Sequence, residues 1–310
     1  MAWARPEKIS KEEIDSAGDI LINPDSTEAD KNRALTILDN WRAIHSYPMH
    51  VFRVRIHQKL GITDKNGLGV QRLKRVPAII AKLRRSEEGR LRKIKLSQLQ
   101  DVGGCRAVLS NAMLARRFYH EHFIKSDLKH KLVNQKDYIT EHRESGYRGL
   151  HLIYRFHSKS PGKRIYNGLL VETQIRSRLQ HLWATAVETV DFFTKQAIKS
   201  NEANQEWLDF FKLVSSAFAM MENSPLVPDT PGDEKELFLK IKEKEKHLNI
   251  IKKMKGWKEA VQIFELAIKN KKALQVFRYF LLELDIPNEK LNISTYTKSQ
   301  EELAIARYSE

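Results

Sequence analysis

The chain has 310 residues, enough for one large domain or two ordinary ones, and 41% of them are hydrophobic, which indicates a globular rather than a disordered protein. Its single cysteine, Cys105, excludes an internal disulfide and a thiolate metal cluster and is typical of a reducing compartment. No apolar run reaches membrane-spanning length, and the first ten residues lack the apolar core of a signal peptide, so we expect a cytoplasmic protein without a membrane segment.

Positive charge is concentrated in the middle of the chain. Residues 41–200 contain 32 Lys and Arg against 12 Asp and Glu, whereas the remaining residues contain 22 basic against 27 acidic side chains. Such a basic segment favours a polyanionic partner, either a nucleotide or a nucleic acid. The alternative is a generic basic surface that keeps the protein in solution.

The N-terminal part of the chain is predicted to be mostly helical. From Glu28 to Leu60 the apolar residues follow a helical spacing, which Pro48 divides into two helices. Residues 61–69 are rich in Gly and Asn and predict a loop. The next segment enters a helix near Pro77, because proline fits the first turn of a helix.

Strands and helices alternate in the middle of the chain. Apolar runs at 103–110, 150–156 and 168–177 predict strands, and residues 111–124 and 178–193 have the spacing of helices. This order predicts an α/β (α+β) protein, with a mixed β-sheet flanked by helices.

The stretch NSPLVPDTPG, with three prolines in ten residues, predicts a linker. The expected organisation is therefore an N-terminal helical segment (1–44), a central domain (45–223), the linker (224–232) and a mainly helical C-terminal extension with two strand-like runs (233–310). The charged run in this extension indicates a solvated helix face rather than a binding site.

Two carboxylates lie on or directly before predicted strands, at positions where they could take part in catalysis or metal binding. Glu172, Gln174 and Arg176 alternate along one predicted strand, so they share one face, which suits a polar substrate site. Asp101 directly precedes an apolar strand, a usual position for a magnesium ligand. An ordinary half-exposed strand and a turn aspartate are the alternative interpretations.

Basic side chains gather before and on the helix that begins near Pro77. They are Arg72, Lys74, Lys82 and Arg85. An arginine binds phosphate with two parallel hydrogen bonds or stacks on a flat ring, while a lysine acts as a point charge. The alternative is a solvated basic helix.

The loop DYITEHRESGYRGLH, which ends at His151, combines an aromatic residue with arginines and a histidine. Gly146 permits a tight backbone turn, and Tyr147 beside it could stack on a nucleotide base. The alternative is a hairpin with a partly buried tyrosine. The sequence contains no P-loop, no G-x-G-x-x-G and no H-E-x-x-H motif.

The order of four motifs is more specific than any one of them. They are Arg72-Leu-Lys74 with Lys82, Asp101-Val-Gly-Gly-Cys-Arg106, Asp137-Tyr-Ile with Gly146-Tyr-Arg-Gly-Leu-His151, and Val171-Glu-Thr-Gln-Ile-Arg176. This series resembles the synthetase domain of the RelA/SpoT family over residues 45–195.

The resemblance implies a nucleotidyltransferase-like fold and an enzyme of the stringent-response type. Such an enzyme transfers the β,γ-diphosphate of ATP to the ribose 3′-hydroxyl of GDP or GTP and makes the alarmone (p)ppGpp. The roles it implies are adenine binding by Arg72 and Arg106, ATP-phosphate binding by Lys74, Lys82 and Arg85, Mg²⁺ binding by Asp101 and Glu172, catalysis by Glu172, Asp101 and His151, and acceptor binding by Tyr147, Arg143, Arg148, His151 and Gln174.

Departures from the family pattern leave the acceptor open. The chain has His142-Arg143 where the family usually has Pro-Lys, and Gly149 where it usually has Ser. The extension resembles that of toxin-like small synthetases, some of which inhibit themselves through such a segment or meet a regulatory protein. The 3′-CCA end of tRNA and an adenosine nucleotide, giving (p)ppApp, are therefore alternative acceptors. A catalytically dead nucleotide or RNA sensor is opposed by the presence of both Asp101 and Glu172.

Overall fold

The computed structural model describes residues 3–5, 9–84, 94–141, 143–194, 198 and 203–258, together with the backbone of residues 279–285 and 290–296. The chain divides into two compact units. One comprises Met1–Leu182 and Phe218–Pro225, and the other comprises Trp183–Ala217 and Leu226–Glu310. No helix among the described residues has both the length and the apolar character needed to cross a membrane.

Helices and strands alternate in the first unit, as predicted. Its elements in chain order are α1 (Lys11–Ile22), α2 (Glu28–Ile44), α3 (Ser46–Thr63), β1 (Leu68–Leu73), α4 (Val76–Arg84), the short η1 (Leu96–Gln98), β2 (Gly103–Leu109), α5 (Ala112–Tyr119), η2 (His120–Ile124), β3 (Lys131–Asp137), β4 (Leu150–Arg155), η3 (Pro161–Tyr166) and β5 (Leu170–Ser177). The elements that follow are α6 (Arg178–Thr194), α7 (Gln205–Met221), α8 (Glu234–Leu248), β6 (Tyr279–Asp285) and β7 (Lys290–Tyr296).

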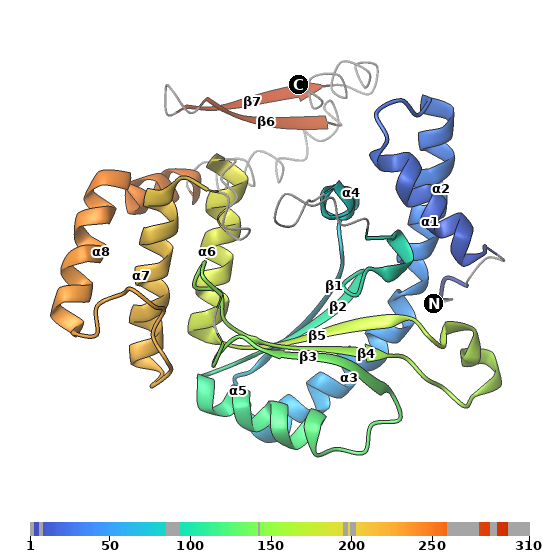
Figure 1. The fold of residues 1–310 in the computed structure, drawn as a ribbon, viewed down its shortest axis with the longest axis horizontal. Coiled ribbons are helices and arrows are strands. Elements are labelled where there is room, and N and C mark those ends of the chain that lie inside the picture. Colours follow the sequence, from blue (N-terminus) through green and yellow to red (C-terminus); the bar gives the residue numbers. More distant parts are fainter. Residues whose placement is uncertain are drawn as a thin grey trace, which may run out of the picture. The chain divides into compact units, whose positions relative to one another are not determined.

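Five strands form one mixed sheet in the order β1-β2-β5-β4-β3 (Figure 1). Only β2 and β5 pair in parallel, and the other neighbours are antiparallel. The predicted mixed β-sheet with flanking helices is therefore confirmed. The central parallel pair matters for function because it sets β2, which begins two residues after Asp101, beside the strand of Glu172.

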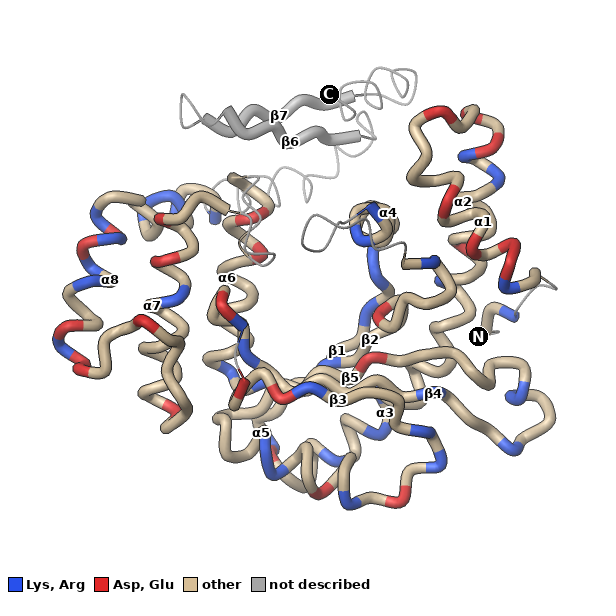
Figure 2. The backbone as a smooth tube through the Cα atoms, viewed as in Figure 1, with Lys and Arg blue, Asp and Glu red and all other residues tan. Residues whose placement is uncertain are grey.

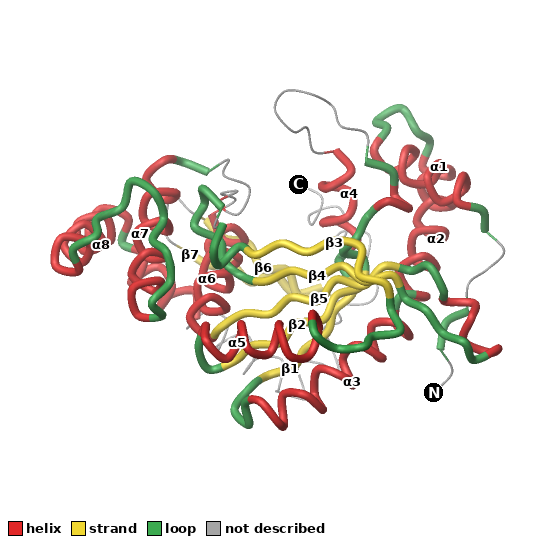
Figure 3. The backbone as a smooth tube through the Cα atoms, turned by 60° about the horizontal axis from the view of Figure 1, so that its bottom comes forward, coloured by secondary structure: helices red, strands yellow, loops and turns green. Residues whose placement is uncertain are grey.

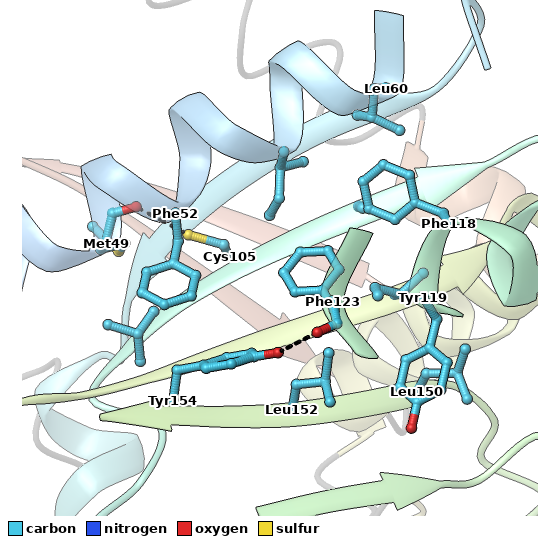
Figure 4. Packing of buried hydrophobic residues seen from close by; sticks show 14 of the residues in the cluster. Met49, Phe52, Leu60, Cys105, Phe118, Tyr119, Phe123, Leu150, Leu152 and Tyr154 are labelled. Atoms are coloured by element: carbon cyan, nitrogen blue, oxygen red, sulfur yellow. Dashed lines mark hydrogen bonds between the residues drawn. The ribbon is translucent and has the colours of Figure 1, made fainter. Parts of the chain in front are cut away.

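Helices α3 and α5 cover one face of this sheet (Figures 1 and 3). Phe52 of α3 packs on Tyr154 of β4, whose hydroxyl donates to the backbone oxygen of Phe123 at 3.3 Å (Figure 4). Cys105 lies in the same cluster, 2% exposed, so its role is packing. Because this face is apolar, the polar side chains that alternate along the strands must project from the opposite face.

Local sequence accounts for where the helices begin. Ser10 and Glu13 form a capping box at the start of α1. The predicted interruption near Pro48 is confirmed, but the break lies at His45, between α2 and α3. Pro48 sits in the first turn of α3, where its missing N–H breaks no helical hydrogen bond.

Two strands of the sheet, β1 and β3, were not predicted. Both are edge strands whose residues are intermediate or exposed throughout, so neither has an apolar run in the sequence. The two strand-like runs predicted near the C-terminus correspond to the antiparallel pair β6–β7. Residues 259–278 of the extension that is predicted to be mainly helical lie outside the described residues.

Candidate active site

A hydrogen-bonded chain runs from the β4–β5 pair into the loop before β4. Glu172 Oε1 lies 2.9 Å from His151 Nδ1, and the other carboxylate oxygen accepts from Gln174 at 2.8 Å. His151 Nε2 lies 2.6 Å from the hydroxyl of Tyr147, which also accepts a hydrogen bond from Arg176 at 2.5 Å. The register of β4 against β5 places His151 opposite Gln174 and beside Glu172, so sheet pairing assembles these groups.

The partners of His151 define its protonation. Burial lowers its pKa, and this effect outweighs the neighbouring Glu172 carboxylate, so the ring is neutral at pH 7. An ionised carboxylate only accepts hydrogen bonds, so Nδ1 carries the proton. Nε2 then accepts from Tyr147, whose oxygen already accepts from Arg176.

Glu172 is ionised although only 15% of its side chain is exposed. Burial alone would raise its pKa, but the hydrogen bonds from His151 and Gln174 hold it below the ordinary value. The charge of Asp101 opposes this shift. The pairing of β2 with β5 sets Gly103, two residues after Asp101, opposite Val171. The result is a buried, oriented carboxylate that can accept a proton.

Asp101 is held by two lysines. Its Oδ2 lies 2.8 Å from the ammonium of Lys74 and 3.0 Å from that of Lys82. Burial alone would raise the pKa of Asp101, but the positive charges of Lys74 and Lys82 together outweigh burial and hold it below the ordinary value. The side chain is therefore ionised at pH 7. Its Oδ1 is buried and has no hydrogen-bond partner among the described residues. That oxygen is therefore available to a cation.

Arg72 and Arg106 project from neighbouring strands on the polar face. Arg72 pairs with Gly104, which in turn pairs with Glu172, and Arg106 lies two residues further along β2. Diagonal neighbours of this kind stand about 7–8 Å apart, room for one flat ring with van der Waals contact on both sides. Arg106 also donates to Gln174 at 3.1 Å, which ties it to the Glu172 network.

Gly104 keeps the space between Arg72 and Glu172 open. A Cβ at this position would lie 4.0 Å from Glu172 Oε2 and 3.8 Å from the Glu172 backbone oxygen. A longer side chain would extend from that point over the carboxylate. The missing side chain therefore leaves the face around Glu172 accessible from the β1 side.

The loop before β4 turns at Gly146, whose φ of 85° suits glycine. Arg143 is at the surface, where its guanidinium lies 4.7 Å from the ring centre of Tyr138 and donates to the Tyr138 hydroxyl at 2.9 Å. Tyr147 and Arg148 are each only 4% exposed. Stacking of a base on Tyr147 therefore requires the loop to open.

Arg148 points into the protein. It donates to the backbone oxygen of Ile139 at 3.2 Å, and burial lowers its pKa to about 10. The carboxylate of Glu222 attracts this charge. A contact between Arg148 and an acceptor stays a prediction, as do the roles of Tyr147 and Arg143.

Ten of the twelve predicted site residues belong to the two hydrogen-bonded groups or the arginine pair, or lie exposed on the loop before β4, as Arg143 does. The side chain of Arg148 in the same loop is buried instead, and Arg85 lies outside the described residues. Sequence reasoning placed Arg176 on the polar face of Glu172 but gave it no specific role; it is 1% exposed and joins Tyr147 to Gln174. The period-two alternation of β5 was the signal for it, since it puts Arg176 on the face of Glu172.

Part of the chain is similar to known proteins. Residues 71–195 match the family model described as a region found in RelA/SpoT proteins. A GTP pyrophosphokinase of Bacillus subtilis (strain 168), YjbM, is 32% identical over 123 residues, which are 39% of this chain. The chain spans only 54% of the length of that relative.

The solved structures that resemble this chain share a lower sequence identity with it than YjbM does. The crystal structure of small alarmone synthetase 1 from Bacillus subtilis has 21% identity and a TM-score of 0.49, covering 60% of this chain and 92% of that one. A GTP pyrophosphokinase family protein from Streptococcus pneumoniae has 17% identity and a TM-score of 0.47, covering 60% of this chain and 89% of that one.

Proposed function

We propose, from the match of residues 71–195 to the RelA/SpoT region, that the protein transfers the β,γ-diphosphate of ATP to the 3′-hydroxyl of GDP or GTP. The relative in Bacillus subtilis named as a GTP pyrophosphokinase supports this reaction class. The observation that carries the proposal is the pair of partly buried carboxylates, Asp101 beside two lysines and Glu172 beside His151.

Glu172 is the group that takes the proton. The acceptor 3′-oxygen attacks the β-phosphorus of ATP, its O–H proton passes to Glu172, and the bond from the β-phosphorus to the α-phosphate oxygen breaks to release AMP. The hydrogen bond from His151 fixes the direction of the carboxylate, and Tyr147 fixes the ring of His151. Such alignment is the main requirement of phosphoryl transfer, which needs little covalent help from the protein.

Lys74 and Lys82 bind the donor phosphates. Both ammonium groups already converge on one point, the Oδ2 atom of Asp101, so phosphate oxygens of ATP can replace that atom as their partner. Arg72 and Arg106 hold the adenine ring between them, in the diagonal arrangement described above.

Magnesium fits the donor side of this site. Asp101 Oδ1 is buried without a partner, and a hard carboxylate oxygen suits Mg²⁺. The described residues include no group of three or more metal-binding side chains, so Asp101 and Glu172 would share the ion with substrate phosphates, as Mg²⁺ commonly is shared. When bound, the ion neutralises charge on the phosphate oxygens.

The test is transfer of label from γ-³²P-ATP. We expect the protein with Mg²⁺ and GDP or GTP to produce a labelled guanosine 3′-diphosphate and one AMP for each acceptor consumed. Reactions without acceptor are the control for hydrolysis. Label that appears only as inorganic phosphate or pyrophosphate, or no AMP at all, would contradict the proposal.

A second candidate acceptor, the 3′ end of tRNA, is favoured by a basic strip at one end of the sheet. The strip consists of Lys129, Lys131, Arg155, Lys159 and Arg164. Figure 2 shows basic positions where β3 begins and β4 ends. Within the described part of the chain, none of the five forms an ion pair with a carboxylate.

Lys131 and Arg155 face each other directly across β3 and β4. Like charges in such a cross-strand pair destabilise a sheet, and an anion would relieve the repulsion. Lysines on an edge strand can also serve to prevent association with another sheet. Arg155 lies on an interior strand, so this explanation does not apply to Arg155. Arg155 also shares the face of His151, about 13 Å along the strand.

Replacing Lys129, Lys131, Arg155 and Lys159 by Gln tests this acceptor. For tRNA we expect the slope of log affinity against log salt to flatten by about 3, since each contact to a single strand contributes about −0.7. The KM for GDP should change less than about twofold. Gln at Lys235, Lys240, Lys242 and Lys246, all exposed on α8, is the control of equal charge. An equal slope change in both quadruple variants would count against the strip.

A further inference from the structure

The two N-terminal helices pack on the helix that carries Lys82. Leu21 of α1 and Leu38 of α2 share one apolar cluster with Ile79 and Leu83 of α4. Gly18 permits a close approach, because a Cβ there would stand 2.8 Å from the Cβ of Leu96. The N-terminal helices and the donor-binding helix therefore form one packed group within their unit.

Polar contacts fix this group further. Asp19 of α1 pairs with Lys95 at 2.6 Å, and Asp15 accepts from the backbone N–H of Ser97 at 2.8 Å. These contacts hold the segment before Asp101 against α1. None of them reaches the segment between β1 and α4, where Lys74 lies.

Arg42 of α2 contacts the segment between β1 and α4, where Lys74 lies. Its Nε donates to the backbone oxygen of Lys74 at 2.9 Å, while its Nη1 pairs with Asp39 on the same helix at 2.7 Å. The backbone N–H of Lys74 donates in turn to Val102 at 2.9 Å. The peptide groups on both sides of the Lys74 Cα are thus held, one from α2 and one from the residue after Asp101.

We propose that Arg42 is a positioning residue for the diphosphate donor, which acts through Lys74 without touching ATP. A lysine side chain has four rotatable bonds, so the place of its ammonium depends on how firmly its backbone is fixed. Arg42 fixes the backbone, and the Asp101 contact then sets the ammonium where donor phosphates must meet it. This inference rests on the proposed function.

The contact is not needed to hold α2 in place. The apolar cluster already secures this helix, and the side chain of Arg42 is still 22% exposed. A purely structural role would predict lower stability and equal loss for both substrates. A positioning role predicts loss for ATP alone.

Arg42→Ala is compared with Arg33→Ala, a matched control. Arg33 lies on the same helix and pairs with an aspartate three residues earlier, Asp30, but forms no hydrogen bond or ion pair with a described residue outside α2. For Arg42→Ala we expect the KM for ATP to rise about tenfold, the scale of a lost charge-assisted hydrogen bond. The KM for the acceptor should stay within about twofold of the control.

A binding measurement separates this inference from the reaction itself. An ATP analogue with a methylene group between the α- and β-phosphorus atoms cannot be cleaved at the bond that breaks. Its dissociation constant, measured by calorimetry, should rise about tenfold in Arg42→Ala and less in Arg42→Lys, which keeps a donor at the end of a long stem. Binding of the analogue without any transfer activity in the wild type would overturn the proposed function and not the role of Arg42.

Equal affinity for the analogue in the Arg42→Ala and Arg33→Ala variants would overturn the role of Arg42. So would parallel losses for ATP and acceptor. If Arg42→Ala fails to fold, Arg42→Lys is compared with Arg33→Ala by the same binding measurement, and equal affinities again overturn the inference.

Discussion

Glu172→Gln is expected to reduce diphosphate transfer by roughly 10²–10⁴-fold, the usual contribution of a general base. The amide has nearly the shape of the carboxylate but cannot take a proton from the 3′-hydroxyl. It retains one oxygen to accept from His151, while Gln174 loses its acceptor. The loss should appear in kcat, because the substrates bind mainly through other groups. Initial rates with saturating ATP and acceptor measure it.

Thermal unfolding checks that this variant is folded, and we expect a change of only a few degrees, about that of one lost hydrogen bond. Glu12→Gln, an exposed position on α1, is the control for a charge change elsewhere. Activity of Glu172→Gln within threefold of wild type would show that another group accepts the proton.

Asp101→Asn is expected to separate nucleotide binding from transfer. The substitution removes the charge that Lys74 and Lys82 share, so both ammonium groups become freer to meet the phosphates of metal-free ATP. Binding of ATP in the presence of a chelator should therefore be equal to or tighter than that of the wild type. Transfer with Mg²⁺ should fall by roughly 10²–10³-fold, since charge stabilisation at the phosphates is lost.

Calorimetry with and without Mg²⁺ measures the first effect, and label transfer measures the second. Asp209→Asn is the matched control, because Asp209 also pairs with a lysine, Lys244, at 3.1 Å, and lies in none of the four motifs. Full transfer activity in Asp101→Asn, or loss of metal-free ATP binding, would remove Asp101 from the donor site.

Much of the central sheet could be read from the sequence. The strands β2, β4 and β5 are interior, so their apolar runs stand out against the polar segments around them. Alternation with period two then put Glu172, Gln174 and Arg176 on one face, and their mutual hydrogen bonds confirm it. The edge strands β1 and β3 were missed because an edge strand needs no apolar run, only a partner.

The partners within the site came from tertiary structure alone. Lys74, Lys82 and Asp101 are separated along the chain, and their convergence depends on how β1, α4 and β2 pack. The contact of Arg42 with the Lys74 carbonyl spans 32 residues and follows no pattern in the sequence. Such contacts depend on backbone positions that local propensity does not determine.

By itself the sequence determined the strand faces, the candidate carboxylates and the match of residues 71–195 to the RelA/SpoT region, because periodicity and motif order are local properties of the chain. Only the tertiary structure decided which side chains of the loop before β4 face inward. Tyr147 and Arg148 are neighbours in an irregular segment with no period, so their directions depend on the turn at Gly146 and on Arg176. Arg176 lies 29 residues from Tyr147, and its bond to the Tyr147 hydroxyl exists only once β5 is in place.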